Sequence, residues 1–193
     1  LRMNAFRSLL IAAVLALPAT TQAQDYPNKP VRIVVPFAPG GINDVAARVL
    51  AQYLSERLGK QFIVENRTGA GGIVGSELVA NAPKDGHTLL FAATAVFSVV
   101  PHLNAATYTW NDFAAIGNLT AVPMLMAARS SAPYKTLKEL VAFAKANPGK
   151  LNFGSAGSGT THHRAGELVK TMTGLSRVHV PDKGAGPMMQ DLI

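Results

Sequence analysis

The chain contains no cysteine among its 193 residues. A disulfide framework, a thiol nucleophile and a thiolate metal site are therefore excluded. Aromatic residues make up only 7% of the chain, and the formal net charge of +7 is spread out, with no run of five or more basic residues. Nucleic-acid surfaces need a clustered basic stripe, often with stacking aromatics, so no nucleic-acid partner is expected. The hydrophobic share of 48% is typical of a globular protein with a buried core.

The apolar run Leu9–Leu17 is too short to cross a bilayer, which takes ~20 residues. Basic residues at Arg2 and Arg7 precede it, and the small residues of Thr21-Gln22-Ala23 follow it. A basic start, a short apolar core and a small-residue exit predict a secretory signal peptide over residues 1–23. We therefore expect cleavage near Ala23 and a periplasmic location.

The rest of the chain alternates short β-like runs with helical patterns, which predicts an α/β fold with parallel sheets. Asn43 is expected to cap the first helix, with Asp44 in its first turn, and Gly59 is expected to end this helix in the left-handed conformation. Thr136 and Glu139 form a capping box at a later helix. The predicted strands are Val31–Val35, Gln61–Glu65, Thr88–Ala92, Leu151–Phe153 and Val178–Val180. The predicted helices are the one after Asn43, Ile73–Asn81, Leu137–Ala146, Thr160–Thr173 and one starting at Gly186.

The familiar catalytic and cofactor motifs fail in this sequence. Val74 stands where a dinucleotide-binding loop would need its third glycine, and neither Ser155 nor Ser158 lies in a G-x-S-x-G elbow. His162 and His163 are adjacent, so on a helix they point ~100° apart and cannot close on one metal. No catalytic residue, metal or cofactor is predicted, and we expect a protein that is not an enzyme.

Two glycine-rich segments each lead from a strand into a helix, Pro36–Asp44 and Gly154–Thr161. Loops that follow parallel strands meet at one edge of the sheet, where ligands bind in open α/β proteins. Free N–H groups at a helix start stabilise carboxylate or phosphate, and glycine lets the backbone approach closely. The alternative is that both are ordinary turns with capping residues. One of the two histidines could face a ligand, and His162 is expected to be solvated or capping.

Several long motifs resemble Bug-type receptors, the periplasmic solute-binding proteins of tripartite tricarboxylate transporters. They occur in the family's order from about Tyr26 to the last residue. They are Tyr26–Gly41, Val64–Arg67 with Gly69–Gly72, Pro83–Leu90, Leu151–Gly159 with Thr160–His163 and Ala165–Leu168, and Val178–Pro181 with Lys183-Gly184 and Gly186-Pro187. Asp182 departs from the family, which commonly has Tyr there, and would add negative charge near the cleft.

The resemblance implies a two-lobed, type II-like periplasmic binding protein fold with the ligand cleft between its lobes. We expect the first lobe over residues 24–122 and the second over 123–193, with the crossing near Ala121–Met124. The end of the chain inside an apolar helical pattern predicts a piece of a longer protein. The second lobe and the closing part of the first would then be incomplete.

The implied function is capture of a small carboxylate or related solute, by a monomer, for delivery to membrane permease subunits. A sensory module for a membrane histidine kinase and an enzyme on the same frame remain alternatives. The implied contact residues lie in the two glycine-rich segments and after the third strand. They are Phe37, Pro39, Gly40, Gly41, Asn43, Asp44, Thr94, Ala95, Ser155, Ala156, Gly157, Gly159, Thr160, Thr161 and His163.

Overall fold

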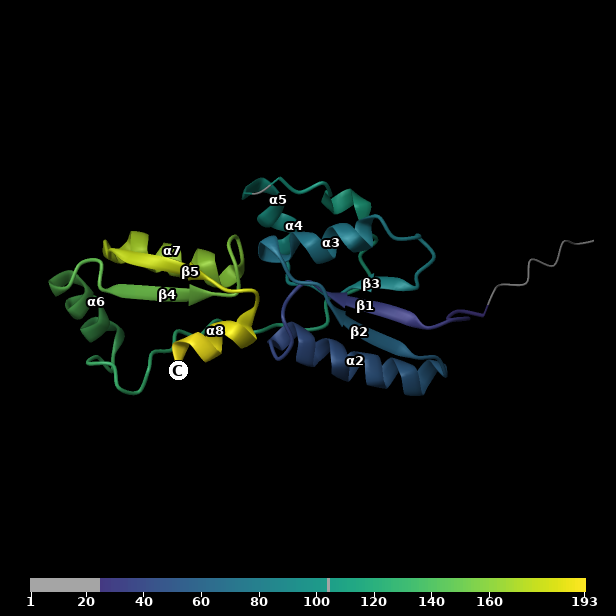
Figure 1. The fold of residues 1–193 in the computed structure, drawn as a ribbon, viewed down its shortest axis with the longest axis horizontal. Coiled ribbons are helices and arrows are strands. Elements are labelled where there is room, and N and C mark those ends of the chain that lie inside the picture. Colours follow the sequence, from purple (N-terminus) through teal and green to yellow (C-terminus); the bar gives the residue numbers. More distant parts are fainter. Residues whose placement is uncertain (1–24, 104) are drawn as a thin grey trace, which may run out of the picture.

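The computed structural model describes residues 25–103 and 105–193, and the predicted signal peptide lies outside them. Its first sheet has three parallel strands in the order β2-β1-β3. They are β1 (Val31–Val35), β2 (Phe62–Asn66) and β3 (Thr88–Leu90). The sheet lies between α2 (Ile42–Leu58) and α3 (Ile73–Ala80) (Figure 1). Coverage on both faces explains why β1 is an almost uninterrupted apolar run.

The core of this part forms where β1 meets α2. Val31, Ile33 and Val35 are at most 1% exposed, and Ala47 and Ala51 of α2 are buried against them. Each fully buried Val or Ile side chain contributes roughly 1.5–3 kcal/mol. The strand prediction for β1 is confirmed, as is the left-handed C-cap of α2 at Gly59. This packed core fixes the position of the loop that joins β1 to α2.

Two short helices follow β3, α4 (Ala95–Ser98) and α5 (Val100–Leu103), and the sequence patterns had missed both. The strand predicted over Thr88–Ala92 therefore ends early, at Leu90. The strand predicted from Gln61 is shifted by one residue, because Asn66 pairs with Val35 in the ladder.

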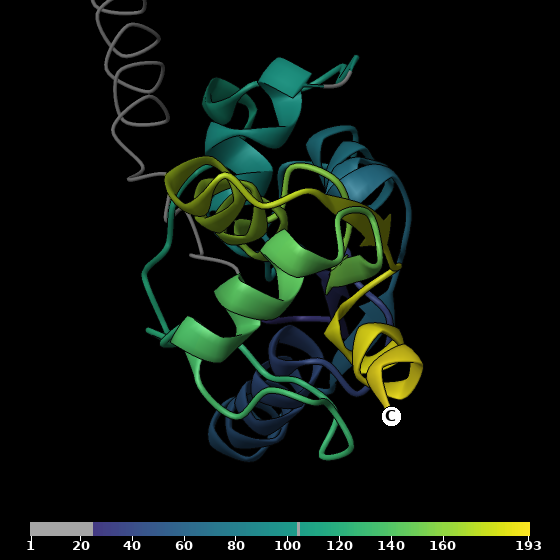
Figure 2. The same ribbon diagram turned by 90° about the vertical axis from the view of Figure 1, so that its left-hand side faces the viewer.

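A second sheet has two parallel strands, β4 (Leu151–Ser155) and β5 (Arg177–Pro181). It lies between α7 (Thr161–Thr173) and α8 (Ala185–Leu192), and α6 (Leu137–Ala146) precedes it (Figure 1). Seen from this end of the molecule, α8 stands apart from α6 and α7 (Figure 2). Here too the parallel α/β prediction is confirmed, and Thr136 and Glu139 form the predicted capping box. Both strands are longer than predicted, β4 reaching Ser155 and β5 reaching from Arg177 to Pro181.

We call the first sheet with its helices the first lobe, and the second sheet with its helices the second lobe. Residues 114–129 connect them without regular secondary structure and are exposed throughout. This connection contains the predicted crossing at Ala121–Met124, and the exact boundary stays a prediction. No helix in residues 25–103 and 105–193 combines the length and apolar character needed to cross a membrane.

Candidate functional site

The loop between β1 and α2 ends in a helix start without a side-chain cap. Gly41 is the N-cap residue, with an extended backbone (φ −80°, ψ 167°), and no side chain bonds to the first turn of α2. The prediction that Asn43 caps this helix is wrong, because Gly41 takes the non-helical conformation and leaves Asn43 inside the first turn. The first N–H groups of α2 are thus left without a capping side chain, although the Asp44 carboxylate in the first turn lies at the positive end of the helix dipole.

Asp44 fixes the conformation of this loop through a hydrogen bond to its backbone. Its carboxylate is 3% exposed and accepts hydrogen bonds from the Gly40 N–H at 2.9 Å and from Asn66 Nδ2 at 3.0 Å, while Arg48 pairs with it at 3.0 Å. Burial acts to raise the pKa of Asp44, but the bonds from Arg48, Gly40 and Asn66 outweigh it, and the pKa is lowered. Asp44 therefore shapes the loop, with its carboxylate occupied by partners from its own chain.

The loop from β4 to α7 is fixed by its own polar side chains. The Oγ atom of Ser155, which is fully buried, accepts from the Gly157 N–H and donates to the Gly157 carbonyl, both at 3.1 Å. Thr160 is the N-cap of α7 and also donates to the Gly157 carbonyl at 2.6 Å. The loop is thus held at Gly157, and α7 has a side-chain cap that α2 lacks. Thr161 is exposed.

The two histidines of α7 occupy different surroundings. His163 Nδ1 accepts from the Gly159 N–H at 3.1 Å, and its ring stacks on that of His179. His162, which is predicted to be solvated or capping, is partly buried, and this burial lowers its pKa. His163 therefore acts on the β4–α7 loop itself.

The backbones of the two lobes meet at two places. The N–H of Ala38 donates to the Lys183 carbonyl at 2.9 Å, which joins the β1–α2 loop to the segment before α8. Gly157 in turn packs against Gly71, where a Cβ added at Gly157 would lie 3.3 Å from the Gly71 Cα. The β1–α2 loop therefore faces α8, and the β4–α7 loop faces the glycine-rich turn before α3.

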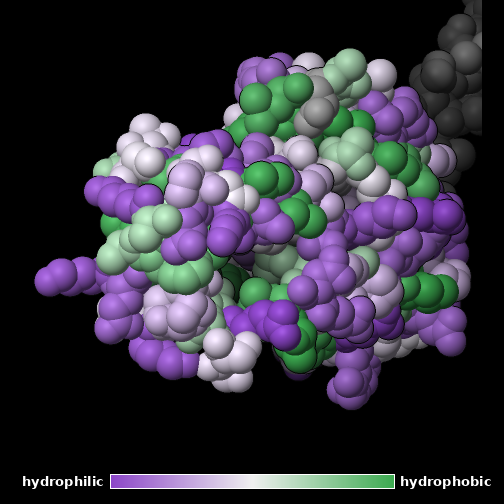
Figure 3. Space-filling view, turned by 60° about the vertical axis from the view of Figure 1, so that its left-hand side comes forward, coloured by the Kyte–Doolittle hydropathy of each residue, from purple (hydrophilic) through white to green (hydrophobic). Residues whose placement is uncertain are grey.

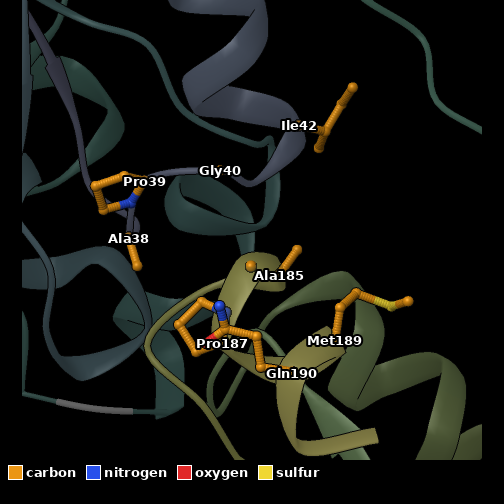
Figure 4. Close-up of a pocket in the computed structure, with 9 residues that line it drawn as sticks. Ala38, Pro39, Gly40, Ile42, Ala185, Pro187, Met189 and Gln190 are labelled. Atoms are coloured by element: carbon orange, nitrogen blue, oxygen red, sulfur yellow. The ribbon is translucent and has the colours of Figure 1, made fainter. Parts of the chain in front are cut away.

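A pocket of about 590 Å³ opens between the β1–α2 loop and the start of α8. We call it the interlobe pocket. Side chains approach it from both sides, with Pro39 and Ile42 opposite Pro187, Met189 and Gln190 (Figure 4). In the space-filling view the molecule is hollowed between the lobes, with hydrophobic residues at the margins (Figure 3). The lining residues are Ala38, Pro39, Gly40, Ile42, Ala185, Gly186, Pro187, Met189 and Gln190.

The start of α8 lines this pocket with residues that are not among the contacts predicted from sequence. Gly184 is the N-cap of α8, and no side chain caps this helix. The start of α2 at Gly41 likewise has no side-chain cap. Two uncapped helix starts therefore border one pocket. The sequence does contain a signal for this helix start, because proline is common in the first turn of a helix and Pro187 lies there. Gly184 to Pro187 also follows a strand, just as the Pro36–Gly41 turn follows β1.

Some of the other predicted contact residues line a second, smaller cavity, and some line neither cavity. Phe37 and Ala156 line a cavity of about 40 Å³ together with Asp182, so one residue from each predicted loop reaches it. Ala95 is buried, Thr94 is exposed, and neither is among the residues that line the two cavities. Within residues 25–103 and 105–193, no three His, Asp or Glu side chains gather as a metal site.

Two α/β lobes with a pocket between them, bordered by helix starts, define a binding protein of the periplasmic type. The sequence profile of the tripartite tricarboxylate transporter family receptor matches residues 46–193. The chain belongs to this family, which confirms the Bug-type resemblance.

Curated relatives agree with this membership. The chain is 42% identical over its whole length to the "UPF0065 protein in the TAR-I ttuE-ttuC' intergenic region" of Agrobacterium vitis, of which it covers 56%. It is 32% identical over 99% of its length to BugT of Bordetella pertussis, of which it covers 61%. The chain thus spans little more than half the length of these relatives.

Solved structures match 86% of the chain. The periplasmic binding protein BugD has a TM-score of 0.76 at 36% identity, with 56% of it covered. MatC from Rhodopseudomonas palustris with bound malate also has a TM-score of 0.76, at 32% identity and 57% coverage. R. palustris Rpa4515 with adipate has a TM-score of 0.66 at 32% identity, with 56% covered. The predicted periplasmic binding protein fold is confirmed.

Proposed function

We propose that this protein is a periplasmic receptor that captures a small dicarboxylate between its lobes and delivers it to the membrane subunits of a tripartite tricarboxylate transporter. The observation that carries the proposal is the interlobe pocket with an uncapped helix start on each side, at Gly41 and Gly184. Each helix start offers N–H donors and the positive end of a dipole, so one carboxylate at each satisfies both.

The chemistry of the pocket lining supports a solute held by backbone donors and apolar contacts. Pro39, Ile42, Pro187 and Met189 supply apolar surface, and Gln190 supplies an amide. A short carbon chain with a carboxylate at each end matches this arrangement. Malate in MatC and adipate in R. palustris Rpa4515 are solutes of this class. Of the contacts predicted from sequence, we retain Pro39, Gly40 and Gly41 for the interlobe pocket, and add Gly184 to Pro187.

The second predicted loop is proposed as the other wall of the closed site. Its residues Ala156, Gly157 and Gly159 are buried at the contact with the first lobe. Release of solute would require this contact to open, as in hinged two-lobed receptors. Thr160 is buried and supports the loop from inside, whereas Thr94 and Thr161 are exposed and stay proposed contacts.

Export is part of the proposed function. The family's receptors are periplasmic, and the predicted signal peptide would direct this chain there. Protein from the periplasm of a Gram-negative host should begin near Gln24 or Asp25, as intact-mass spectrometry would show. Detection of a cytoplasmic protein that retains Met3 would contradict export.

Calorimetric titration of the purified protein with malate, adipate and a neutral diol of similar length tests the binding proposal. We expect binding of at least one dicarboxylate and none of the diol. A Cβ at Gly41 would lie 3.6 Å from the Ala185 Cβ and N, an ordinary contact, whereas the two further methyl groups of valine would crowd the start of α8. Gly41→Val should abolish binding, and Gly41→Ala, the matched control, should largely keep it. Equal binding by both variants would overturn the site.

A further inference from the structure

A stacked pair of histidines lies beneath the β4–α7 loop. His163 of α7 and His179 of β5 have ring centroids 3.9 Å apart with 16° between the ring planes. Each ring bonds to a different end of the loop. The Gly159 N–H donates to His163 Nδ1 at 3.1 Å, and His179 Nε2 lies 2.7 Å from the Oγ of Ser155. One imidazole pair therefore fixes both ends of a segment that contacts the first lobe.

Ser155 connects His179 to Gly157, the residue at the tip of the loop. Its buried Oγ bonds to both the N–H and the carbonyl of Gly157. Gly157 is the residue that packs against Gly71 of the first lobe. A displacement of the His179 ring would therefore be transmitted through one side chain to the contact between the lobes.

The hydrogen bonds prescribe the protonation state of His163. Because the Gly159 N–H is the donor, His163 Nδ1 must carry no proton, so the ring is the neutral Nε2–H form. A proton added at Nδ1 would set two N–H groups against each other and break the bond. Two charged rings stacked at 3.9 Å would also repel each other. The loop conformation in the structure is thus that of a neutral pair.

The charges around the pair reinforce this preference. Burial lowers the pKa of His179, and the neighbouring His163 lowers it further. Glu167 and Lys170, both on α7, act in opposite directions, since the carboxylate raises this pKa and the ammonium lowers it. The Arg177 guanidinium lies 5.0 Å from the Phe153 ring centroid, and the Phe153 ring is stacked on that of His179 with the centroids 5.0 Å apart.

We propose that His163 and His179 are positioning residues that hold the β4–α7 loop in its lobe-contacting conformation only while both rings are neutral, so that acidification releases the loop. A released loop leaves His179 free to bind protons at its ordinary pKa of 6.5. The held state therefore binds fewer protons, and its stability is lost as the pH falls below that value. The consequence for solute affinity rests on the proposed function.

NMR of the purified protein with its complete chain tests the device without any ligand. Long-range proton–nitrogen spectra should show His163 in the Nε2–H form near pH 7.5, within the range where histidine is commonly neutral. Below about pH 6.5 the amide signals of Gly157 and Gly159 should move together with the imidazole signals. Constant glycine signals across the histidine titration would overturn the proposal, as would a protonated Nδ1 at neutral pH.

Substitution of one histidine distinguishes an effect of the His163–His179 pair from a general effect of acid on the protein. His179→Gln keeps a partner for Ser155 but has no titrating proton, and the exposed His102→Gln is the matched control. The pH response of the Gly157 signal should be smaller in H179Q, which keeps only the His163 bond to the loop, and should be unchanged in H102Q. An equal response in both variants would contradict the positioning role.

Malate affinity gives a second readout. Between about pH 7.5 and about pH 5 malate affinity should fall more in the parent protein than in H179Q, because only the parent carries the His179 proton-binding group. Comparison at equal pH cancels the protonation of malate itself. If malate binds and both proteins lose affinity equally, the device fails and the proposed function stands. If no solute binds although the glycine signals respond as expected, the device is supported and the proposed function fails.

Discussion

The Asp44 carboxylate accepts a hydrogen bond from the Gly40 N–H at 2.9 Å, and this contact bends the β1–α2 loop back onto its own helix. The bend sets Gly41 at the N-cap and leaves the helix start without a side-chain cap. Asp44 is nearly inaccessible and also bonds Asn66 and Arg48, so it joins the loop, β2 and α2 at one point.

Asp44→Asn should lower the free energy of unfolding by about 1–3 kcal/mol, because an amide places donor hydrogens where the site supplies only donors. Glu56→Gln on the exposed side of the same helix is the matched control and should change stability by less than about 0.5 kcal/mol. Urea unfolding at neutral pH measures both variants. Equal midpoints would contradict the role of Asp44.

The same contact predicts a pH dependence. The pKa of Asp44 is lowered in the folded protein relative to its ordinary 3.8. Its contribution to stability is therefore complete above that value and is lost as the pH falls through the lowered pKa. The difference in unfolding free energy between the parent protein and Asp44→Asn should accordingly narrow in strong acid. A difference that stays constant into strong acid would exclude an ionised Asp44 as its source.

Thr160 and Thr161 offer a neighbouring pair of identical residues with different surroundings. Thr160 is 4% exposed, caps α7 and donates to the Gly157 carbonyl, whereas Thr161 is exposed. Thr160→Val should cost about 1–2 kcal/mol of stability through the lost cap. Thr161→Val should stay within about 0.5 kcal/mol. Thermal unfolding monitored by circular dichroism distinguishes them, and a larger loss in the Thr161 variant would be inconsistent with the cap assignment.

Most of the secondary structure could be predicted from short stretches of the sequence. The apolar run Val31–Val35, the left-handed Gly59 and the capping box of Thr136 each determine their structure within a few residues, so the sequence predicts them correctly. Asn43 shows the limit. Its capping preference is real, but Asp44, the third residue of the helix, bonds to the Gly40 N–H and so moves the helix start to Gly41. Asn66, 22 residues away in the sequence, holds Asp44 in this position, and a local pattern does not show that contact.

The site was less predictable because its parts are far apart in sequence. The sequence identified both glycine-rich loops but paired them with each other across one cleft. In the structure the interlobe pocket is completed by α8, through the Ala38 to Lys183 hydrogen bond, which joins residues of different lobes. His179 was missed because nothing near it in the sequence shows that Ser155 and His163 lie beside it.

Asp85 should titrate far below other aspartates. Its Oδ2 lies 2.8 Å from Lys29 Nζ, and its Oδ1 accepts from the His87 N–H at 3.0 Å. The hydrogen bond from Lys29, followed by that from His87, lowers the pKa of Asp85 to about 2. Carbon-detected NMR titration should find a midpoint near that value, and Lys29→Met should raise it. A midpoint at the ordinary 3.8 in the parent protein would disprove the pairing.

Gly71 tests whether the contact between the lobes is needed for the closed form. Its φ is +67°, and a Cβ there would overlap the carbonyl oxygen of Ser158 in the opposite lobe. Gly59 has almost the same φ, +66°, but a Cβ there meets no atom within 4 Å. Alanine at either position therefore carries similar backbone strain, about 1 kcal/mol, and only Gly71→Ala obstructs the second lobe.

We expect both variants to lose a similar amount of folding stability. Small-angle scattering should show a larger radius of gyration for Gly71→Ala alone, since the β4–α7 loop can no longer rest on the turn before α3. Dicarboxylate affinity, if bound as proposed, should fall in the same variant and persist in Gly59→Ala. If the two variants have the same radius of gyration, the closed arrangement of the lobes does not depend on the Gly71 contact. The backbone strain that both substitutions share would then be their only effect.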